Sequence, residues 1–290
     1  MSFDNAYEAL TEQNDARWAF GTGFDDPLAG VDTALPPGVD AAVLSGYCLA
    51  LADDALIASQ RLAEWVTRAP ELEDEVALAN IALDLLGQAR LLLARAGRTG
   101  EAVRDEDELA YFRDAHEFRN VRLVEQPHGD FAETVARLLV LSSWRLALFT
   151  RLTSSEDPVL AAIAAKGAKE LAYHRDYAAQ WVVRLGDGTA ESHRRMRAGF
   201  DEVRPFLAEL FAVGDVERAA TAQGVGADPA AALDEVTAVL EQVCSAATVD
   251  APPIAPATEV SGRVGEHTAH LAPLLAELQG VARAHPEGTW

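Results

Sequence analysis

Apolar residues recur every three or four positions along most of the chain after residue 41, which is the spacing of one buried face of an α-helix. No segment shows the sustained alternation of apolar and polar residues that a half-buried strand requires. The sequence therefore predicts an all-α fold. In the two clearest segments the predicted inward positions are Phe131, Val135, Leu138, Ser142, Arg145 or Leu146, and Phe149, then Ile163, Gly167, Glu170 or Leu171, His174, Ala178, Trp181 and Leu185.

Helix-terminus signals divide this pattern into elements. Acidic residues favour a helix start near Glu71, Asp130 with Glu133 forms a capping-box pattern, and Asp157 precedes a proline suited to a first helical turn. The predicted long helices span about 41–68, 71–96, 131–154 and 158–185, and the shorter ones about 104–117, 189–212, 229–247 and 266–284. Four long helices with an extended second connection predict a ferritin-like four-helix bundle with additional C-terminal helices.

The first part of the chain has a different composition. The stretch GTGFDDPLAGVDTALPPGVD is rich in Gly, Pro and Asp, which favour turns over helices. We therefore expect a poorly ordered N-terminal arm over residues 1–40 and one ferritin-like helical domain over residues 41–290.

Charge and cysteine content exclude several classes of protein. The chain has 46 Asp and Glu against 24 Lys and Arg, a balance that disfavours nucleic-acid and anionic-membrane partners. Cys48 and Cys244 form no C-x-x-C pair, so neither a disulfide framework nor a cysteine metal site is expected. We see no signal peptide and no apolar run of the roughly 20 residues needed to cross a bilayer. A cytoplasmic protein is the expectation.

A ferritin-like bundle raises the question of a di-iron centre. Such a centre takes a carboxylate from each of two helices and a Glu-x-x-His pair from each of the other two. The helices predicted over 71–96 and 158–185 contain no Glu-x-x-His. Leu171 stands three residues before His174, and Gly87 stands three residues after Asp84.

The remaining candidates make about half of such a site. Glu170 lies one position away from the required carboxylate, and the first and third long helices offer Asp53 or Asp54 and Ser142. We expect a buried polar cluster in which His174 and its neighbours satisfy Asp84 and Asp53, with a weak mononuclear metal site as the alternative. No catalytic, cofactor-binding or metal-binding residue is predicted. The vestigial di-iron positions are Asp53, Asp84, Gly87, Ser142, Leu171 and His174.

Other motifs have ordinary structural explanations. His267 and His270 stand three residues apart, but no third zinc ligand is evident, so capping or interface hydrogen bonds are the better interpretation. A basic run is typical of a solvated helix face, with an anionic ligand or acidic partner as the alternative, and two tryptophans are expected in the core. These residues are Arg194, Arg195 and Arg197, and then Trp144 and Trp181.

Several segments resemble the phenylacetyl-CoA oxygenase, a 1,2-epoxidase, and within it the ferritin-like subunit designated C. They are SQRLAEW (59–65), APELEDEVALANIALDLLGQAR (69–90), LVEQPHGDFAETVAR (123–137), ALFTRL (147–152), KELAYH (169–174) and EHTAHLAPLLAELQ (266–279). They occur in order and with close spacing, and the similarity covers roughly residues 43–290.

The resemblance implies a ferritin-like fold and a set of partners. In that family the homologous catalytic subunit, designated A, carries the di-iron centre and binds the CoA thioester. The subunit that this chain resembles is its structural, non-catalytic companion. Other oxygenase subunits take part, and a reductase with FAD and an iron–sulfur centre supplies electrons from NADPH. The catalytic subunit's motif resembles KEESFH; laid over KELAYH, its histidine falls on His174 and its ligand glutamate on Leu171.

Three functions follow from these observations. The resemblance favours a non-catalytic subunit that supports a di-iron partner in phenylacetate catabolism. An iron-binding oxygenase or a ferritin-like storage protein, acting without that partner, is the alternative. An independent iron enzyme would need metal bound by this chain, against which Gly87 and Leu171 count.

Overall fold

The computed structural model describes residues 28–100, 102–256 and 261–288, and within these ranges the regular elements are all helices. This confirms the predicted all-α class. The longer helices are α2 (Ala41–Ala63), α3 (Leu72–Thr99), α5 (Phe131–Leu152) and α6 (Pro158–Gly186). The shorter ones are α4 (Glu106–Tyr111), α7 (Ala190–Val203), α8 (Asp215–Ala222), α9 (Leu233–Ala246) and α10 (Leu271–Ala284).

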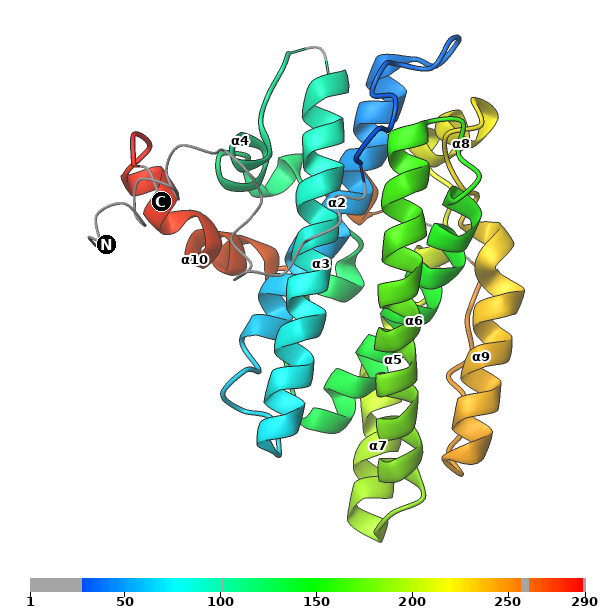
Figure 1. Cartoon of the computed structure of the whole chain (residues 1–290). Helices are drawn as coiled ribbons and strands as arrows, with labels where there is room; N and C mark the ends of the chain where they lie inside the picture. The colour runs from blue at the N-terminus through cyan, green and yellow to red at the C-terminus, as the bar shows by residue number, and fades with distance from the viewer. Residues whose placement is uncertain (1–27, 101, 257–260, 289–290) are drawn as a thin grey trace, which may run out of the picture.

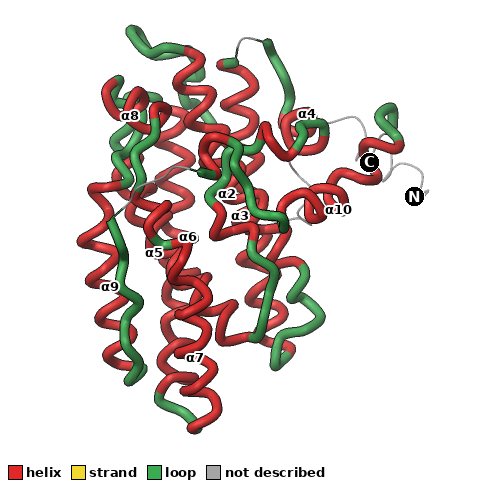
Figure 2. Tube along the Cα trace, turned by 180° about the vertical axis from the view of Figure 1, so that it is seen from behind, coloured by secondary structure: helices red, strands yellow, loops and turns green. Residues whose placement is uncertain are grey.

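The four longer helices form the centre of the molecule (Figure 1). Helix α2 packs on α3, α5 packs on α6, and α3 meets α6 between these two hairpins. The two hairpin connections are short, whereas residues 102–130 run back along the bundle through α4 and the 3-10 turns Ala115–Glu117 and Arg122–Glu125. Helices α4 and α10 lie on one flank and α8 and α9 on the other, as the reverse view in Figure 2 also shows.

Three aspartates begin the longer helices by accepting backbone hydrogen bonds. Asp40 accepts from the amide of Ala42, Asp130 from Glu133 at 3.1 Å, and Asp157 from Leu160 at 2.7 Å. Each contact satisfies an amide that has no partner within its own helix. The predicted caps at Asp130 and Asp157 are therefore present.

Several predicted boundaries were wrong. Helix α2 ends at Ala63, five residues before the expected end, and the next residues form turns. The helix expected over 104–117 ends at Tyr111, and the one expected over 189–212 ends at Val203, where 3-10 turns begin around Pro205. Helix α8 was not predicted, and α10 begins at Leu271 rather than near residue 266.

The predicted N-terminal arm lies partly within the described residues. Leu28, Val31 and Val39 pack against the core, and Arg95 donates to the Thr33 carbonyl at 2.6 Å. Residues 28–40 are thus in contact with the helical domain. Residues 1–27 lie outside the described part of the chain.

Two of the central helices are more apolar than the sequence pattern suggested. By length and composition, α2 and α3 each contain an 18-residue window that would suit a membrane span, with a mean hydropathy of 1.5. In α2, 67% of that window is buried inside the fold, as expected of a core helix. In α3 only 44% is buried. An apolar part of α3 therefore faces away from the core.

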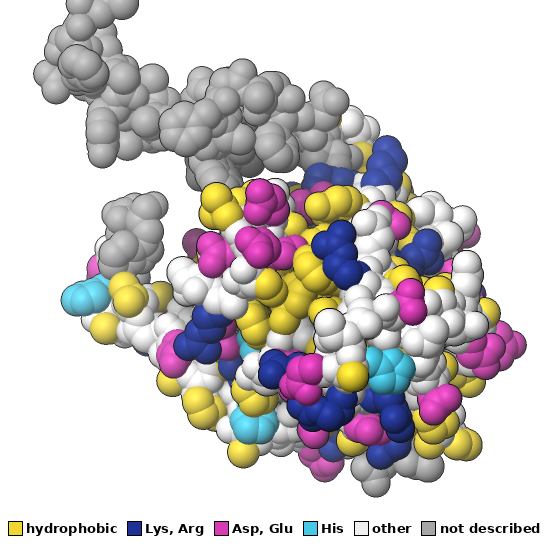
Figure 3. Space-filling model, turned by 90° about the horizontal axis from the view of Figure 1, so that it is seen from below, with side chains coloured by type: hydrophobic (Ala, Val, Ile, Leu, Met, Phe, Trp, Pro, Cys, Tyr) yellow, Lys and Arg dark blue, Asp and Glu magenta, His cyan; other side chains and the backbone are white. Residues whose placement is uncertain are grey.

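The surface mixes charges of both signs. The face in Figure 3 carries Lys and Arg side chains beside Asp and Glu side chains, with apolar atoms exposed between them. The formal net charge of the whole chain is −22. On this face the acidic side chains are thus interspersed with basic ones.

Candidate functional site

Helices α3 and α6 bring together the one carboxylate–imidazole pair expected at the bundle centre. His174 is fully buried, and its Nε2 lies 3.0 Å from Oδ2 of Asp84, whose side chain is 35% exposed. The other ring nitrogen of His174 is buried without a hydrogen-bond partner among the described residues. Leu171 is buried beside the histidine, and a Cβ added at Gly87 would meet nothing within 4 Å.

An arginine occupies the bundle interior one helical turn from this pair. Gln88 donates from Nε2 to Glu170 at 3.0 Å and accepts at Oε1 from Nη2 of Arg145 at 3.1 Å. Glu170 also contacts Lys166 on its own helix. Arg145 is fully buried, and its Nη1 donates to the Leu51 carbonyl on α2 at 3.2 Å.

The two aspartates of α2 are held by other arginines. Asp53 accepts from Arg113 at 3.0 Å and from the amide of Arg119 at 2.8 Å. Asp54 accepts from Arg263 at 2.8 Å and lies 3.7 Å from Arg145. The expectation that His174 and its neighbours satisfy Asp53 is therefore wrong, because a carboxylate saturated by guanidinium and amide donors needs no further partner.

Neither α2 aspartate reaches the pair formed by Asp84 and His174. Among the residues that the structure describes, Asp54 is connected to that region through Arg145 and Gln88. Ser142 also stays apart, since its hydroxyl donates to the Leu138 carbonyl of its own helix at 2.6 Å. Of the six positions singled out in the sequence, the structure thus joins two as a hydrogen-bonded pair.

This set of side chains does not fit a di-iron centre. Within the described residues, no group of three or more His, Cys, Asp or Glu side chains is placed to hold a metal ion. Two adjacent iron ions need several carboxylate oxygens that are free to coordinate them. Here Arg113 and Arg263 already engage the α2 carboxylates, and Arg145 brings a positive charge into the interior.

The surroundings of Arg145 and Arg263 shift the pKa values of these two buried arginines in opposite directions. Burial lowers the pKa of Arg145 to about 10, and the nearby carboxylate of Asp54 opposes that effect. Arg145 is thus still cationic at neutral pH. Burial alone would lower the pKa of Arg263 too, but Asp54 and Glu217 raise it above its ordinary value.

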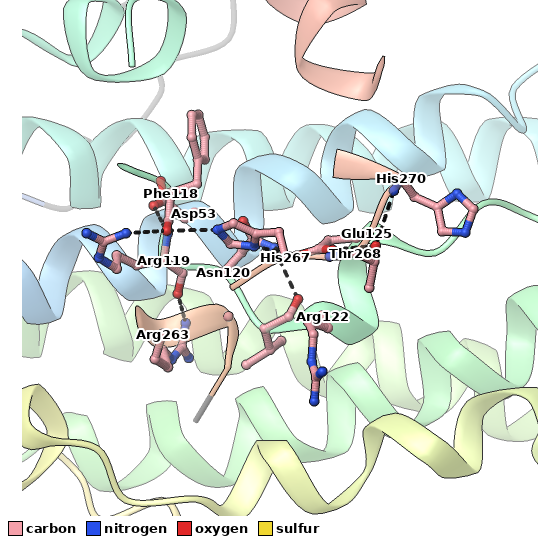
Figure 4. Close-up of polar contacts among 12 residues, drawn as sticks. Asp53, Phe118, Arg119, Asn120, Arg122, Glu125, Arg263, His267, Thr268 and His270 are labelled. Carbon is pink, nitrogen blue, oxygen red and sulfur yellow. Dashed lines mark hydrogen bonds and ion pairs between the residues drawn. The ribbon is translucent and has the colours of Figure 1, made fainter. Parts of the chain in front are cut away.

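A second polar cluster joins the long connection to the C-terminal segment (Figure 4). Glu125 is fully buried and accepts from Asn120 at 2.9 Å, from the amide of Thr268 at 2.7 Å and from its hydroxyl at 2.6 Å. His267 lies with Nδ1 2.6 Å from the same carboxylate and donates from Nε2 to the Phe118 carbonyl at 3.0 Å. The cluster fastens three distant parts of the sequence together.

The two histidines of this segment do not share a ligand. Figure 4 shows the side chain of His270 pointing away from that of His267. His267 makes the interface hydrogen bonds that the sequence favoured over zinc. His270 is exposed, and its amide lies 3.3 Å from the Thr268 hydroxyl.

His128, in the loop VEQPHGD, is held as a neutral base. Its Nε2 donates to the Arg61 carbonyl at 2.5 Å, and its Nδ1 accepts from Arg137 at 2.6 Å. Burial lowers the pKa of His128 to about 3, and the neighbouring Arg137 and Arg61 add to the effect. The ring also meets Trp65 edge to face at 5.4 Å. It is a packing residue of the α2–α5 contact.

The remaining candidates lie mostly where the ordinary interpretation put them. Arg194 and Arg195 are exposed and pair with Glu191 on the same helix. Trp144 is buried, as expected. Trp181 is only half-buried, which corrects its assignment to the core.

Comparisons with known proteins identify the family of this chain. Residues 32–290 match the model of a family described as phenylacetic acid catabolic protein. The chain belongs to this family. A curated relative from Escherichia coli (strain K12), the 1,2-phenylacetyl-CoA epoxidase subunit designated C, is 44% identical over 248 residues, which cover 85% of this chain and 99% of the relative. The resemblance seen in the sequence is confirmed, and with it the ferritin-like fold.

Sequence reasoning missed the residues that dominate the interior. Arg113 and Arg263 lie in connecting segments, where an arginine is normally expected in solvent. Arg145 was considered only as an alternative to Leu146 in the apolar seam, and both proved to be buried. The available signal was the position of Arg145, three residues after Ser142 on the predicted inward face of the helix, which indicated a buried guanidinium group.

Proposed function

We propose that this chain is the structural, non-catalytic subunit of a phenylacetyl-CoA 1,2-epoxidase. Its similarity to the E. coli epoxidase subunit supports membership of such a complex. The observation that carries the non-catalytic role is the fully buried Arg145, whose positive charge lies among Asp54, Gln88 and the Leu51 carbonyl. A cation fixed there disfavours metal ions in the same space.

In this proposal the partner is the homologous catalytic subunit, which holds the di-iron centre and the CoA thioester. A reductase with FAD and an iron–sulfur centre delivers electrons from NADPH, and O₂ supplies the oxygen atom of the ring epoxide. Other oxygenase subunits complete the complex, which we place in the cytoplasm. The present chain contributes a rigid helical surface that keeps the catalytic bundle in its productive shape.

The experiment measures iron and turnover separately. We expect near-zero iron in this chain purified alone from iron-rich medium, and ring epoxidation only when it is mixed with the catalytic subunit and the reductase. A His174→Ala variant should leave that epoxidation within twofold of the unmodified complex. About two irons per chain would favour the iron-binding oxygenase or storage protein. Equal turnover and equal melting temperature of the catalytic subunit alone would remove the supporting role.

A further inference from the structure

The outward side of α3 is apolar where a surface helix is normally polar. Leu72, Val76 and Leu83 point into solvent with 70%, 53% and 50% of their surface exposed. Their spacing of four and seven residues places them on one side of the helix, over roughly 16 Å of its length. Val76 and Leu83 contribute to the low buried share of the apolar α3 window.

Aromatic side chains lie on the neighbouring helix α6, beside the start of α3. Tyr173 is 51% exposed, and Tyr177 and Trp181 follow at intervals of four residues, both half-buried. The Tyr177 hydroxyl and Trp181 Nε1 each donate to Oδ1 of Asp74 at 2.9 Å. These bonds fix the two rings before any partner arrives, which lowers the entropy lost on binding.

A hollow of about 340 Å³ opens where α3 begins and α6 ends. It is lined by Glu71, Glu73, Asp74, Tyr177, Gln180, Trp181 and Arg184. Figure 3 views this end of the molecule, where apolar atoms lie exposed among charged side chains. Arg184 already lies over the Trp181 ring, 4.6 Å from its centroid, so the exposed carboxylates of Glu71 and Glu73 are the groups that suit a partner's Lys or Arg side chain.

We propose that this α3–α6 face, defined by Leu72, Val76, Leu83, Tyr173, Tyr177 and Trp181, docks the catalytic subunit of the epoxidase. The inference rests on the proposed function, because a member of a complex must bury part of its surface against its neighbours. The docked surface is helical, apolar at its centre and basic at its edge. Exposed aromatic and aliphatic side chains in a row are the usual anchors of such contacts.

The charge of the face favours the catalytic subunit over two other possible occupants, a second copy of this chain and an anionic lipid surface. The hollow beside the face is lined by three carboxylates, those of Glu71, Glu73 and Asp74, against one cation, Arg184, and the chain as a whole carries a formal charge of −22. A second copy would bring the same acidic border against itself, and an anionic lipid surface would repel it. A basic-edged protein surface is attracted to it.

The test compares two variants of the face with a matched control. Val76→Arg and Leu83→Arg each place a charge at the centre of the face, whereas Val281→Arg makes the Val76 substitution at a site of 60% exposure on α10. Kd for the purified catalytic subunit is measured by titration calorimetry, and circular dichroism verifies folding. We expect Val76→Arg and Leu83→Arg to weaken binding at least tenfold and Val281→Arg to change it less than twofold.

The charged border has its own readout. The double variant Glu71→Gln with Glu73→Gln should slow association and flatten its dependence on NaCl concentration, since steering by opposite charges acts on the on-rate. Both side chains are exposed, so the chain should still fold, with a small loss of stability for each negative charge removed from the start of α3. An unchanged salt dependence would contradict the basic edge.

Each other result overturns the inference in a distinguishable way. If the unmodified chain binds the catalytic subunit and Val76→Arg binds equally well, the proposed function stands and the docking face is wrong. If the unmodified chain does not bind at all, both fail. Dimerisation of the chain alone that Val76→Arg abolishes would assign the face to a second copy. Sedimentation with phosphatidylcholine–phosphatidylglycerol vesicles that Val76→Arg abolishes would assign it to a membrane.

Discussion

Arg145 shows how one side chain can change what a bundle interior is able to hold. It is fully buried, and its guanidinium links α5 to Asp54 and Leu51 on α2 and to Gln88 on α3. A buried charge needs polar partners in place of water, and the carboxylate of Asp54 and the side-chain amide of Gln88 fill that role for Arg145. These groups are thus engaged by a fixed cation, and Arg263 engages Asp54 as well.

Replacement of Arg145 by methionine tests that role. Arg145→Met keeps similar bulk but removes the charge facing Asp54 and the donor facing Gln88, so we expect unfolding free energy to fall by about 3 kcal/mol. The exposed Arg194→Met on α7, whose side chain is 66% exposed, should change it by less than about 0.5 kcal/mol. Urea denaturation measures both. Equal midpoints for the two variants would contradict a structural Arg145.

His128 gives a pH-dependent prediction with a definite sign. Its pKa is about 3 in the folded chain, because of burial and the neighbouring arginines, against about 6.5 for an exposed histidine. Between these values the unfolded chain binds a proton that the folded chain does not, so stability falls as pH falls below about 6.5, by up to about 1.4 kcal/mol per unit. His128→Gln should reduce that slope, whereas His270→Gln should not, as urea denaturation at pH 7 and pH 5 would show.

At the scale of elements, two glycines of the central helices differ in the space that a side chain would have. A Cβ on Gly167 of α6 would lie 2.7 Å from the Phe149 ring on α5, whereas one on Gly87 of α3 would meet nothing within 4 Å. The first glycine permits close packing of two helices. The second, which is half-buried, has open space where a side chain would lie and only adds backbone freedom.

Alanine at these two positions should therefore shift stability in opposite directions. Gly167→Ala should cost about 1–3 kcal/mol through overpacking against Phe149. Gly87→Ala should gain up to about 1 kcal/mol, because alanine has the higher helix propensity and fits without contact. Thermal melts of the isolated variants provide the measurement. A stabilising Gly167→Ala would mean that α5 and α6 are not packed as closely as described.

Helix periodicity predicted the elements better than it predicted their ends. The spacing of apolar residues and the caps Asp130 and Asp157 located α5 and α6 within about two residues, because both signals are local. The end of α2 and the short helix α8 were missed, since their limits depend on tertiary contacts rather than on a local stop signal. The same limit applies to the interior, where pairs such as Asp54 with Arg263 join residues far apart in sequence.

For the molecule as a whole, the C-terminal segment acts as a strap across the bundle (Figure 4). Arg263 donates to Asp54 on α2 and to the Arg119 carbonyl in the long connection, and it lies 3.1 Å from Glu217 on α8. Further along, Gln279 on α10 donates to the carbonyls of Ala110 and Arg113. One stretch of chain thereby holds the central helices, the long connection and α8 in register.

Removal of that strap should unfold the domain rather than loosen one edge. A chain that ends at residue 260 deprives three buried carboxylates of partners. Asp54 loses Arg263, Glu125 loses His267 and Thr268, and Glu209 loses the amide of Gly262. Breaking a buried pair costs about 3–5 kcal/mol, and a domain has only about 5–15 kcal/mol in total.

The control is a chain that ends at residue 285, which retains α10 and every contact of the strap described above. It should melt within a few degrees of the full chain, whereas the chain that ends at residue 260 should be recovered without a cooperative thermal transition. Calorimetry and near-ultraviolet circular dichroism distinguish the two. A cooperative melt of the shorter chain close to that of the full one would mean that the buried carboxylates find other partners, and that the bundle is stable without its C-terminal segment.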